Sequence, residues 1–380
     1  MSEEFIGDRL RQLRLINEKS LQDVGEAIAA TKQYIQQIEA GLQKPTEMTQ
    51  NALADYFGVS KSFFIQKYNH IYESECNFRK AKSTPVNVKE KAQQYASLLE
   101  EYIKFLDEDE FDLPTISFLK EDIDYKNLSA LNIEELAEKL RKEWGLDVET
   151  PIDDMTKALE NAGAIVTYFK ELSDKVDAFS ISRNRPLVIR NNEKYNGCRL
   201  RFDLAHECGH LVLHKCSDNA EDIELKEEQA NRFASAFLLP RKGFFQEFYG
   251  VFAGMSINWR KMAELKKRWK VSFASMIHRA YDLNIIDAVR YRSAYIYLRK
   301  SGQSKTEQGD DYINIETSSL LENMTNHLVA NDIEDLASFI RNKGWSADLF
   351  AKVMSFNVDK VKEYMNKQNN VISFENYKLG

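Results

Sequence analysis

Two histidines and a glutamate with the spacing of a metal-binding helix occupy residues 202–214, which read FDLAHECGHLVLH. In a helix, His206 and His210 lie one turn apart on one face with about 6 Å of axial rise, so both imidazoles can converge on one ion. Glu207 lies beside them as a carboxylate that can accept a proton. Because the chain has six His in 380 residues, H-E-x-x-H is expected by accident in about one such chain in a hundred. The segment therefore predicts a metal site.

A zinc site that carries out hydrolysis needs a third protein ligand and one position for water. His214 continues the four-residue series, but it would lie ~12 Å along the axis from His206, too far for one tetrahedral ion. We expect His214 to support the ligands or to pack. Glu227 and Asn231 lie four residues apart on a second apolar helix, in EEQANRFASAFLLP. Spacing alone does not decide whether Glu227 or Glu228 is the third ligand. Asn231 could hydrogen-bond a ligating His and fix its tautomer.

This combination of residue types favours Zn²⁺ as the cofactor and peptide hydrolysis as the reaction. Zinc lowers the pKa of water and polarises a scissile carbonyl, and Glu207 would act as the general base. His278 or Arg279 would supply the hydrogen-bond donor that the oxyanion of the tetrahedral intermediate needs. The four Cys lack C-x-x-C spacing, which predicts free thiols in a reducing compartment.

The segments around this helix indicate a mainly α protein with a small β-sheet, an α+β fold. Helical spacing of apolar residues covers 133–144 and 153–162, and three strand-like runs follow between 164 and 190. The metal-binding helix, over 198–214, comes directly after them. The simplest arrangement is a small sheet beside that helix.

The first 64 residues read as short helices joined by tight turns, the arrangement of a helix-turn-helix. The helix over 31–40 carries amides and hydroxyls on its outer side, and these groups suit the edges of DNA bases, while Gln22 could bond a phosphate. A small helical bundle that binds proteins is the alternative. The expected DNA contacts are Gln22, Thr31, Lys32, Gln33, Gln36 and Gln37.

Charge limits how tightly this region would bind DNA. Residues 1–64 carry seven Lys or Arg against nine Asp or Glu, a net charge of −2. Phosphate contacts dominate affinity for DNA, so a monomer should bind weakly. We expect a homodimer that presents two recognition helices to one double-stranded operator.

The length of 380 residues predicts several domains. Residues 1–66 form the helix-turn-helix, and 67–115 form a helical connector that spaces two domains or, alternatively, dimerises as a coiled coil. Residues 116–295 form the metallopeptidase domain and 296–380 a helical C-terminal domain of unknown role. A basic run over 266–270 predicts a solvated face or a groove for DNA or substrate.

Composition and the N-terminus suggest where the chain works. The net charge of −7 argues against indiscriminate nucleic-acid binding by the whole molecule. The acidic N-terminus lacks the pattern of a secretory signal, and no apolar run approaches the ~18 residues that span a bilayer. We expect a cytoplasmic protein with no membrane partner.

Two segments resemble known families. VGEAIAATKQYIQQIEAGLQKP resembles the XRE, or Cro/repressor-like, DNA-binding domain. RLRFDLAHECGHLVLH followed by EEQANRFASAFLLP resembles the ImmA/IrrE family of zinc metallopeptidases, and Val176–Ser180 and Leu265–Leu283 also match, so this likeness spans roughly residues 130 to 295. The second resemblance implies His206, His210 and Glu227 as zinc ligands, with Glu207 as the base.

Together the resemblances imply an XRE-type regulator fused to an ImmA/IrrE-type zinc metallopeptidase. Some members of the second family relieve repression by inactivating a repressor. The implied function is a DNA-binding transcriptional regulator whose zinc endopeptidase cleaves a repressor or another regulatory protein. The alternatives are a transcription factor whose metallopeptidase fold serves only for sensing or dimerisation, and a component of a phage-defence or toxin–antitoxin cassette.

Overall fold

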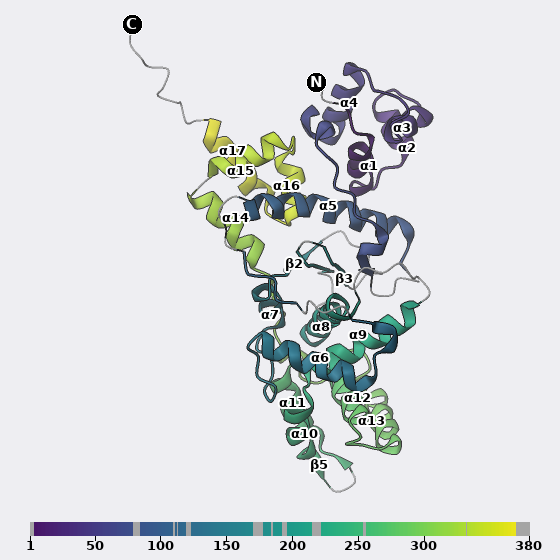
Figure 1. Ribbon diagram of the computed structural model, residues 1–380, viewed down its shortest axis with the longest axis vertical. Helices are drawn as coiled ribbons and strands as arrows, with labels where there is room; N and C mark the ends of the chain where they lie inside the picture. Colours follow the sequence, from purple (N-terminus) through teal and green to yellow (C-terminus); the bar gives the residue numbers. More distant parts are fainter. Residues whose placement is uncertain are drawn as a thin grey trace.

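The chain adopts the expected α+β fold, in which helices enclose one small mixed sheet (Figure 1). Within the described part of the chain, no helix combines the length and apolarity needed to cross a membrane. The first two residues of the 176–180 match and the end of the C-terminal segment lie outside that part. The computed structural model describes residues 4–78, 84–108, 111, 113–118, 123–169, 178–183, 185–191, 196–214, 222–253, 256–331 and 333–369.

The N-terminal helices form where the sequence predicts them. Ser20 and Thr31 each accept a backbone amide hydrogen bond at the start of a helix, which satisfies donors that the first turn leaves free. The element expected after Ser60 is a short 3₁₀ helix, η1 (Lys61–Ile65). The four preceding helices are α1 (Gly7–Ile16), α2 (Leu21–Ala27), α3 (Lys32–Glu39) and α4 (Glu47–Phe57).

The four-stranded sheet has the order β1-β3-β4-β2. β2 and β4 are parallel, while β3 is antiparallel to both β4 and β1. β1 was not predicted, because three residues are too few to show an alternating pattern. The strands are β1 (Cys76–Phe78), β2 (Ile165–Tyr168), β3 (Ala178–Ile181) and β4 (Leu187–Arg190).

Helices cover both faces of the sheet, so β2, β3 and β4 are largely buried and rich in apolar residues. Ile165 and Leu187 pack into a core with α5 (Val86–Glu108), whereas their neighbours Val166 and Val188 pack into a second core on the opposite face. α5, which the sequence predicted as a connector that spaces two domains, is therefore also part of the hydrophobic core. The apolar face of α5 is buried against the sheet and neighbouring helices. Tyr95 stacks on Phe169, and several further side chains of this face are fully buried.

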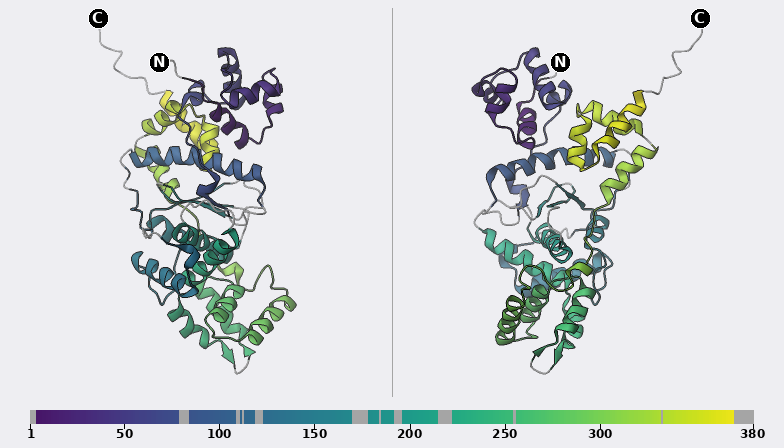
Figure 2. Two further views of the ribbon diagram at one scale, coloured as in Figure 1. Left: turned by 45° about the vertical axis from the view of Figure 1, so that its right-hand side comes forward. Right: turned by 180° about the vertical axis from the view of Figure 1, so that it is seen from behind.

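α5 also holds the helix-turn-helix and the C-terminal helices, which lie side by side on it (Figures 1 and 2). On one side, Arg9 of α1 forms a buried 2.6 Å ion pair with Glu101. On the other, the Tyr102 hydroxyl lies 2.9 Å from that of Thr325. The helix-turn-helix is thus packed against α5. The C-terminal helices are α14 (Leu320–Asn331), α15 (Ile333–Asn342), α16 (Ala347–Met354) and α17 (Val358–Asn369).

The second face of the sheet carries the helices of the expected metallopeptidase region. The predicted boundary at residue 295 falls inside α13 (Ala288–Lys300). The other elements are α6 (Ala130–Glu143), α7 (Met155–Asn161), α8 (Gly197–Leu213), α9 (Ile223–Leu238), α10 (Arg241–Tyr249), β5 (Phe252–Ala253), β6 (Ser256–Ile257), α11 (Trp259–Trp269) and α12 (Phe273–Asp282).

The segment after α13 packs back over this region and covers the start of the basic run at 266–270. Lys266 is 1% exposed and its ammonium lies 2.8 Å from Glu307 and 2.5 Å from Asp310. Glu307 also accepts the backbone amides of Phe273 and Ala274 at the start of α12. Lys266 therefore belongs to neither a solvated face nor a nucleic-acid groove, since two half-buried carboxylates neutralise it.

Candidate metal centre

The centre is built on α8, which is buried along most of its length. The Asn196 side chain accepts the Arg199 amide and caps its first turn. α9 crosses closely at Gly209, where an added Cβ would lie 3.2 Å from Cα of Ala230. This close approach places the first turns of α9 beside the middle of α8.

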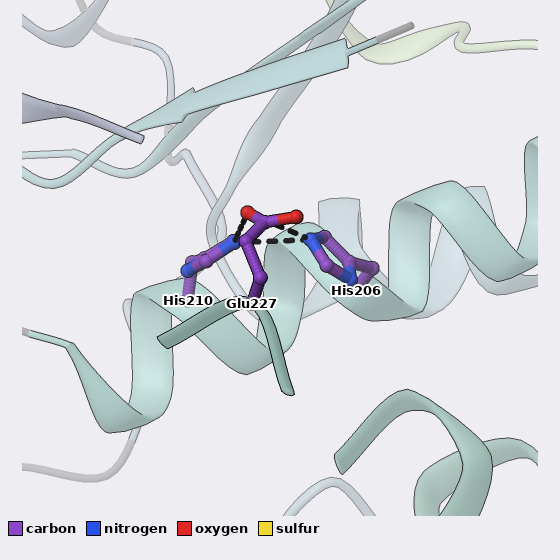
Figure 3. Close-up of side chains that lie close together, drawn as sticks. All are labelled: His206, His210 and Glu227. Atoms are coloured by element: carbon purple, nitrogen blue, oxygen red, sulfur yellow. Dashed lines mark hydrogen bonds and ion pairs between the residues drawn. The ribbon is translucent and has the colours of Figure 1, made fainter. Parts of the chain in front are cut away.

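Three side chains from these two helices meet at one point (Figure 3). The Nε2 atoms of His206 and His210 lie 3.0 Å apart. Oε1 of Glu227 lies 3.2 Å from Nε2 of His210 and 3.6 Å from that of His206. Both imidazoles are at most 3% exposed, and the Glu227 side chain is 25% exposed. The structure thus brings together the three residues that the sequence suggested as ligands.

A chain of hydrogen bonds fixes the tautomer of His210. Gln229 donates through Nε2 to the carbonyl of Tyr125, so its Oε1 is left to accept from Nε2 of His214 at 3.0 Å. The Nδ1 atom of His214 then has a lone pair, and Nδ1–H of His210, 2.9 Å away, donates to it. His210 consequently turns a lone pair on Nε2 towards Glu227.

Asn231 fixes the tautomer of His206. Its Oδ1 lies 2.9 Å from Nδ1 of His206 and can only accept, so His206 also presents a lone pair on Nε2. Sequence reasoning anticipated a supporting role for Asn231 and His214, but it missed Gln229 and Tyr125. The only sequence signal for Gln229 is a polar residue between the apolar positions of α9.

Burial decides the charge states around the cluster. Burial lowers the pKa of His214 to about 3, so this ring is neutral at ordinary pH. Burial alone would raise the pKa of Glu227, but the neighbouring rings of His206 and His210 favour its charged form and outweigh burial, so its pKa lies far below its usual range. Two imidazole lone pairs and a carboxylate oxygen therefore face one another within 4.8 Å. Such a donor set repels itself unless a cation lies between the atoms, and it suits Zn²⁺.

The positions of Glu207, Glu228 and Cys208 distinguish the remaining candidates for a role at the cluster. Glu207 is fully buried, one residue on from His206. Glu228 is exposed and lines a different cleft, so it does not join the cluster. Cys208 is fully buried, and this burial raises the pKa of its thiol, so it is a core residue rather than a thiolate.

The two expected oxyanion donors have different surroundings. Arg279 is fully buried and bonds both carboxylate oxygens of Glu134 and the carbonyl of Leu239. The prediction for Arg279 is therefore wrong, because its guanidinium ties α12 to α6 and α9. His278 is 56% exposed, lies 3.2 Å from the Tyr291 hydroxyl, and lines a cleft of about 680 Å³ together with Asn231.

The polar side chains expected to read DNA lie on the open side of α2 and α3. Thr31, Lys32, Gln33 and Gln36 are exposed, and Gln37 is half-buried. The exposed Gln22 donates to Glu26 at 2.6 Å, so it would have to leave that carboxylate to bind a phosphate. No nucleic acid is needed to order α3, since Ile35 and Ile38 anchor its inner face.

Two known families match the parts of the chain that carry α3 and the metal cluster. Residues 6–62 match a family described as a helix-turn-helix domain, and residues 160–281 match one described as an IrrE N-terminal-like domain. The chain joins a helix-turn-helix domain to an IrrE/ImmA-type domain. It is accordingly a DNA-binding regulator that carries a metallopeptidase-like domain. The IrrE-like match contains α8 and α9, and hence all three clustered side chains.

Searches for whole-chain relatives add little to the helix-turn-helix and IrrE-type assignment. No curated protein matches the chain. The crystal structure of ComR from Streptococcus suis is similar at 13% sequence identity over 98% of this chain and 96% of that chain, with a TM-score of 0.16. A score this low supports no argument about fold or function.

Proposed function

We propose that this regulator carries a zinc-dependent endopeptidase that cleaves a repressor or another regulatory protein. The observation that supports it most is the convergence of the His206, His210 and Glu227 lone pairs, with their tautomers held from behind. A site that merely filled a core would not keep three mutually repelling acceptors together. The proposed zinc ligands are therefore these three residues.

The chemistry assigned to the chain's own residues follows from their positions. A zinc ion bound here would supply Lewis acidity to the scissile carbonyl and to water. Glu207 takes the proton from the attacking water and passes it to the leaving amine. Asn231 and His214 hold the imidazoles in place, and burial of α8 excludes competing solvent.

The helix-turn-helix domain gives the peptidase a regulatory setting. We propose that α3 enters the major groove of an operator and that Thr31, Lys32, Gln33, Gln36 and Gln37 contact it. The net charge of −2 over residues 1–64 favours a homodimer on two half-sites, because one such module binds phosphate weakly.

Replacing Glu207 with Gln tests the proposed activity. The substitution keeps the size of the side chain and removes the base, so zinc should remain bound while cleavage is lost. Proteome-wide quantification in cells carrying the wild type or Glu207→Gln should reveal a regulatory protein that accumulates only in the variant. If zinc is retained, protein levels are equal and gene regulation is unaltered, the domain is a sensing or dimerisation module and the proposal fails.

A further inference from the structure

A row of four cross-strand neighbours crosses the sheet on the face that α8 covers. The register pairs Asn77 with Ser180, Ser180 with Val188, and Val188 with Val166. Residues paired across strands share a face. Because both valines belong to the core on the α8 side, Asn77 and Ser180 face that side as well. Cys76 of β1 and the two residues that flank Ser180 in β3, Phe179 and Ile181, agree, since they pack into the core around α5.

The two polar members of this row are buried donors without a protein partner. The Ser180 hydroxyl and Nδ2 of Asn77 are both shielded from solvent, and neither has a hydrogen-bond partner among the residues that the structure describes. Ser180 is fully buried. A buried donor left unpaired costs about 1 to 3 kcal/mol, so proteins rarely keep one except where a ligand or water completes it. Two such donors on neighbouring strands indicate a binding function.

These donors face the helix that carries the metal cluster. β3 packs directly against α8, and the close approach is possible because its residues on that face, Ala178 and Ser180, are small. Strands of the sheet pass over the side of α8 from which the imidazoles rise (Figure 3). Glu207 is fully buried and follows His206 directly, on the helix against which β3 packs.

We propose that the Asn77 amide and the Ser180 hydroxyl donate hydrogen bonds to main-chain carbonyl oxygens of a peptide substrate. The proposal rests on the proposed peptidase function and names the part of the substrate that is recognised. An extended peptide offers a carbonyl acceptor at every residue, whatever its side chains. Two neutral donors on neighbouring strands match such acceptors and carry no charge that would select a side chain. They position the main chain beside Glu207.

Asn77 lies outside the IrrE-like match at 160–281, in the segment between the helix-turn-helix and α5. The substrate site is therefore completed by a residue from the part of the chain that leads to the DNA-binding domain. This arrangement gives the peptidase a requirement that the matched domain alone does not meet.

The test uses the full chain, zinc-loaded, with a random mixture of internally quenched fluorescent peptides as the probe. Asn77→Leu and Ser180→Ala each remove one donor, and each should lower kcat/KM by about three- to tenfold. Zinc content should stay unchanged, and urea unfolding should show each variant at least as stable as the wild type, because the lost group had no partner. Thr156→Val is the matched control: its hydroxyl is equally buried and unpartnered, but it lies in the first turn of α7.

Each outcome decides the matter. Wild-type cleavage that both variants and the control retain in full would overturn the inference while leaving the peptidase function standing. Equal losses in Thr156→Val would show a general packing effect and would also overturn it. If Ser180→Ala fails to fold, Asn77→Leu alone decides, since Asn77 is only half-buried at the sheet edge. A wild type that cleaves no peptide refutes the proposed function, and the inference with it.

Discussion

The Nδ1 atom of His210, in the last turn of α8, lies 2.9 Å from that of His214, the residue that ends the helix. His214 is too far along the helix to share an ion with His206, and it instead orients the ring that would bind one. It is held in turn by Gln229, and its ring meets that of Tyr125 edge to face. We therefore propose that the third histidine of the series positions His210 and does not bind the ion itself.

Removing this support should weaken metal binding without removing a ligand. His214→Phe keeps a ring in the core but deletes the acceptor for Nδ1–H of His210, so the His210 tautomer is no longer fixed. We expect zinc affinity to fall by about 10- to 100-fold, as measured by competition with a chromophoric chelator. His327→Phe, an exposed position on α14, is the control and should leave affinity unchanged. Equal affinities in wild type and His214→Phe would show that the relay has no effect on the metal.

Sequence-selective DNA binding should depend on the outer side of α3. Replacing both Gln33 and Gln36 with Ala removes bidentate donors and acceptors for base edges, each worth about 1 to 3 kcal/mol. In an electrophoretic mobility assay, preference for the protein's own promoter over scrambled DNA should be lost, while weak non-selective binding persists. Gln308→Ala, an exposed change in the segment after α13, serves as control. A double variant that keeps full selectivity would show that α3 is not the recognition helix.

The substitution Gly344→Ala should destabilise the packing of the helix-turn-helix against the C-terminal helices. Gly344 and Gly302 both have positive φ, +69° and +76°, so Ala at either costs about 1 to 2 kcal/mol. Only at Gly344 would the new Cβ also overlap the backbone of Phe63, because the loop after α15 presses on η1. Urea unfolding should show that Gly344→Ala lowers the free energy of unfolding by about 1 kcal/mol or more beyond the effect of Gly302→Ala, the order of magnitude of one overpacked contact. Backbone amide hydrogen exchange should rise in α1 and η1 of Gly344→Ala alone. Equal losses of stability in Gly344→Ala and Gly302→Ala would mean that the helix-turn-helix and the C-terminal helices do not stabilise each other.

Much of the fold could be read from local patterns. Caps such as Ser20, Thr31 and Ser272 mark helix starts because the stabilising contact lies within three residues. The pairing of His206 with His210 is equally local, since one helical turn separates them.

What the sequence could not show depends on contacts between distant segments. Periodicity predicted that α5 has an apolar face, but not that a sheet and two further helical units would cover it. Glu227 and Glu228 differ by a 100° rotation about α9, and only the crossing at Gly209 turns the first of them towards the histidines. Arg279 looked free for catalysis because its partner, Glu134, is remote in sequence.

We propose that His206, His210 and Glu227 hold one zinc ion. The most direct test is the metal content of purified wild type, Glu227→Ala and Glu228→Ala by inductively coupled plasma mass spectrometry. The two variants remove the same group from neighbouring positions on α9, so each controls for the other. We predict about one zinc per chain in the wild type and in Glu228→Ala, and a large loss in Glu227→Ala. Full zinc in Glu227→Ala, or loss in Glu228→Ala alone, would contradict the assignment.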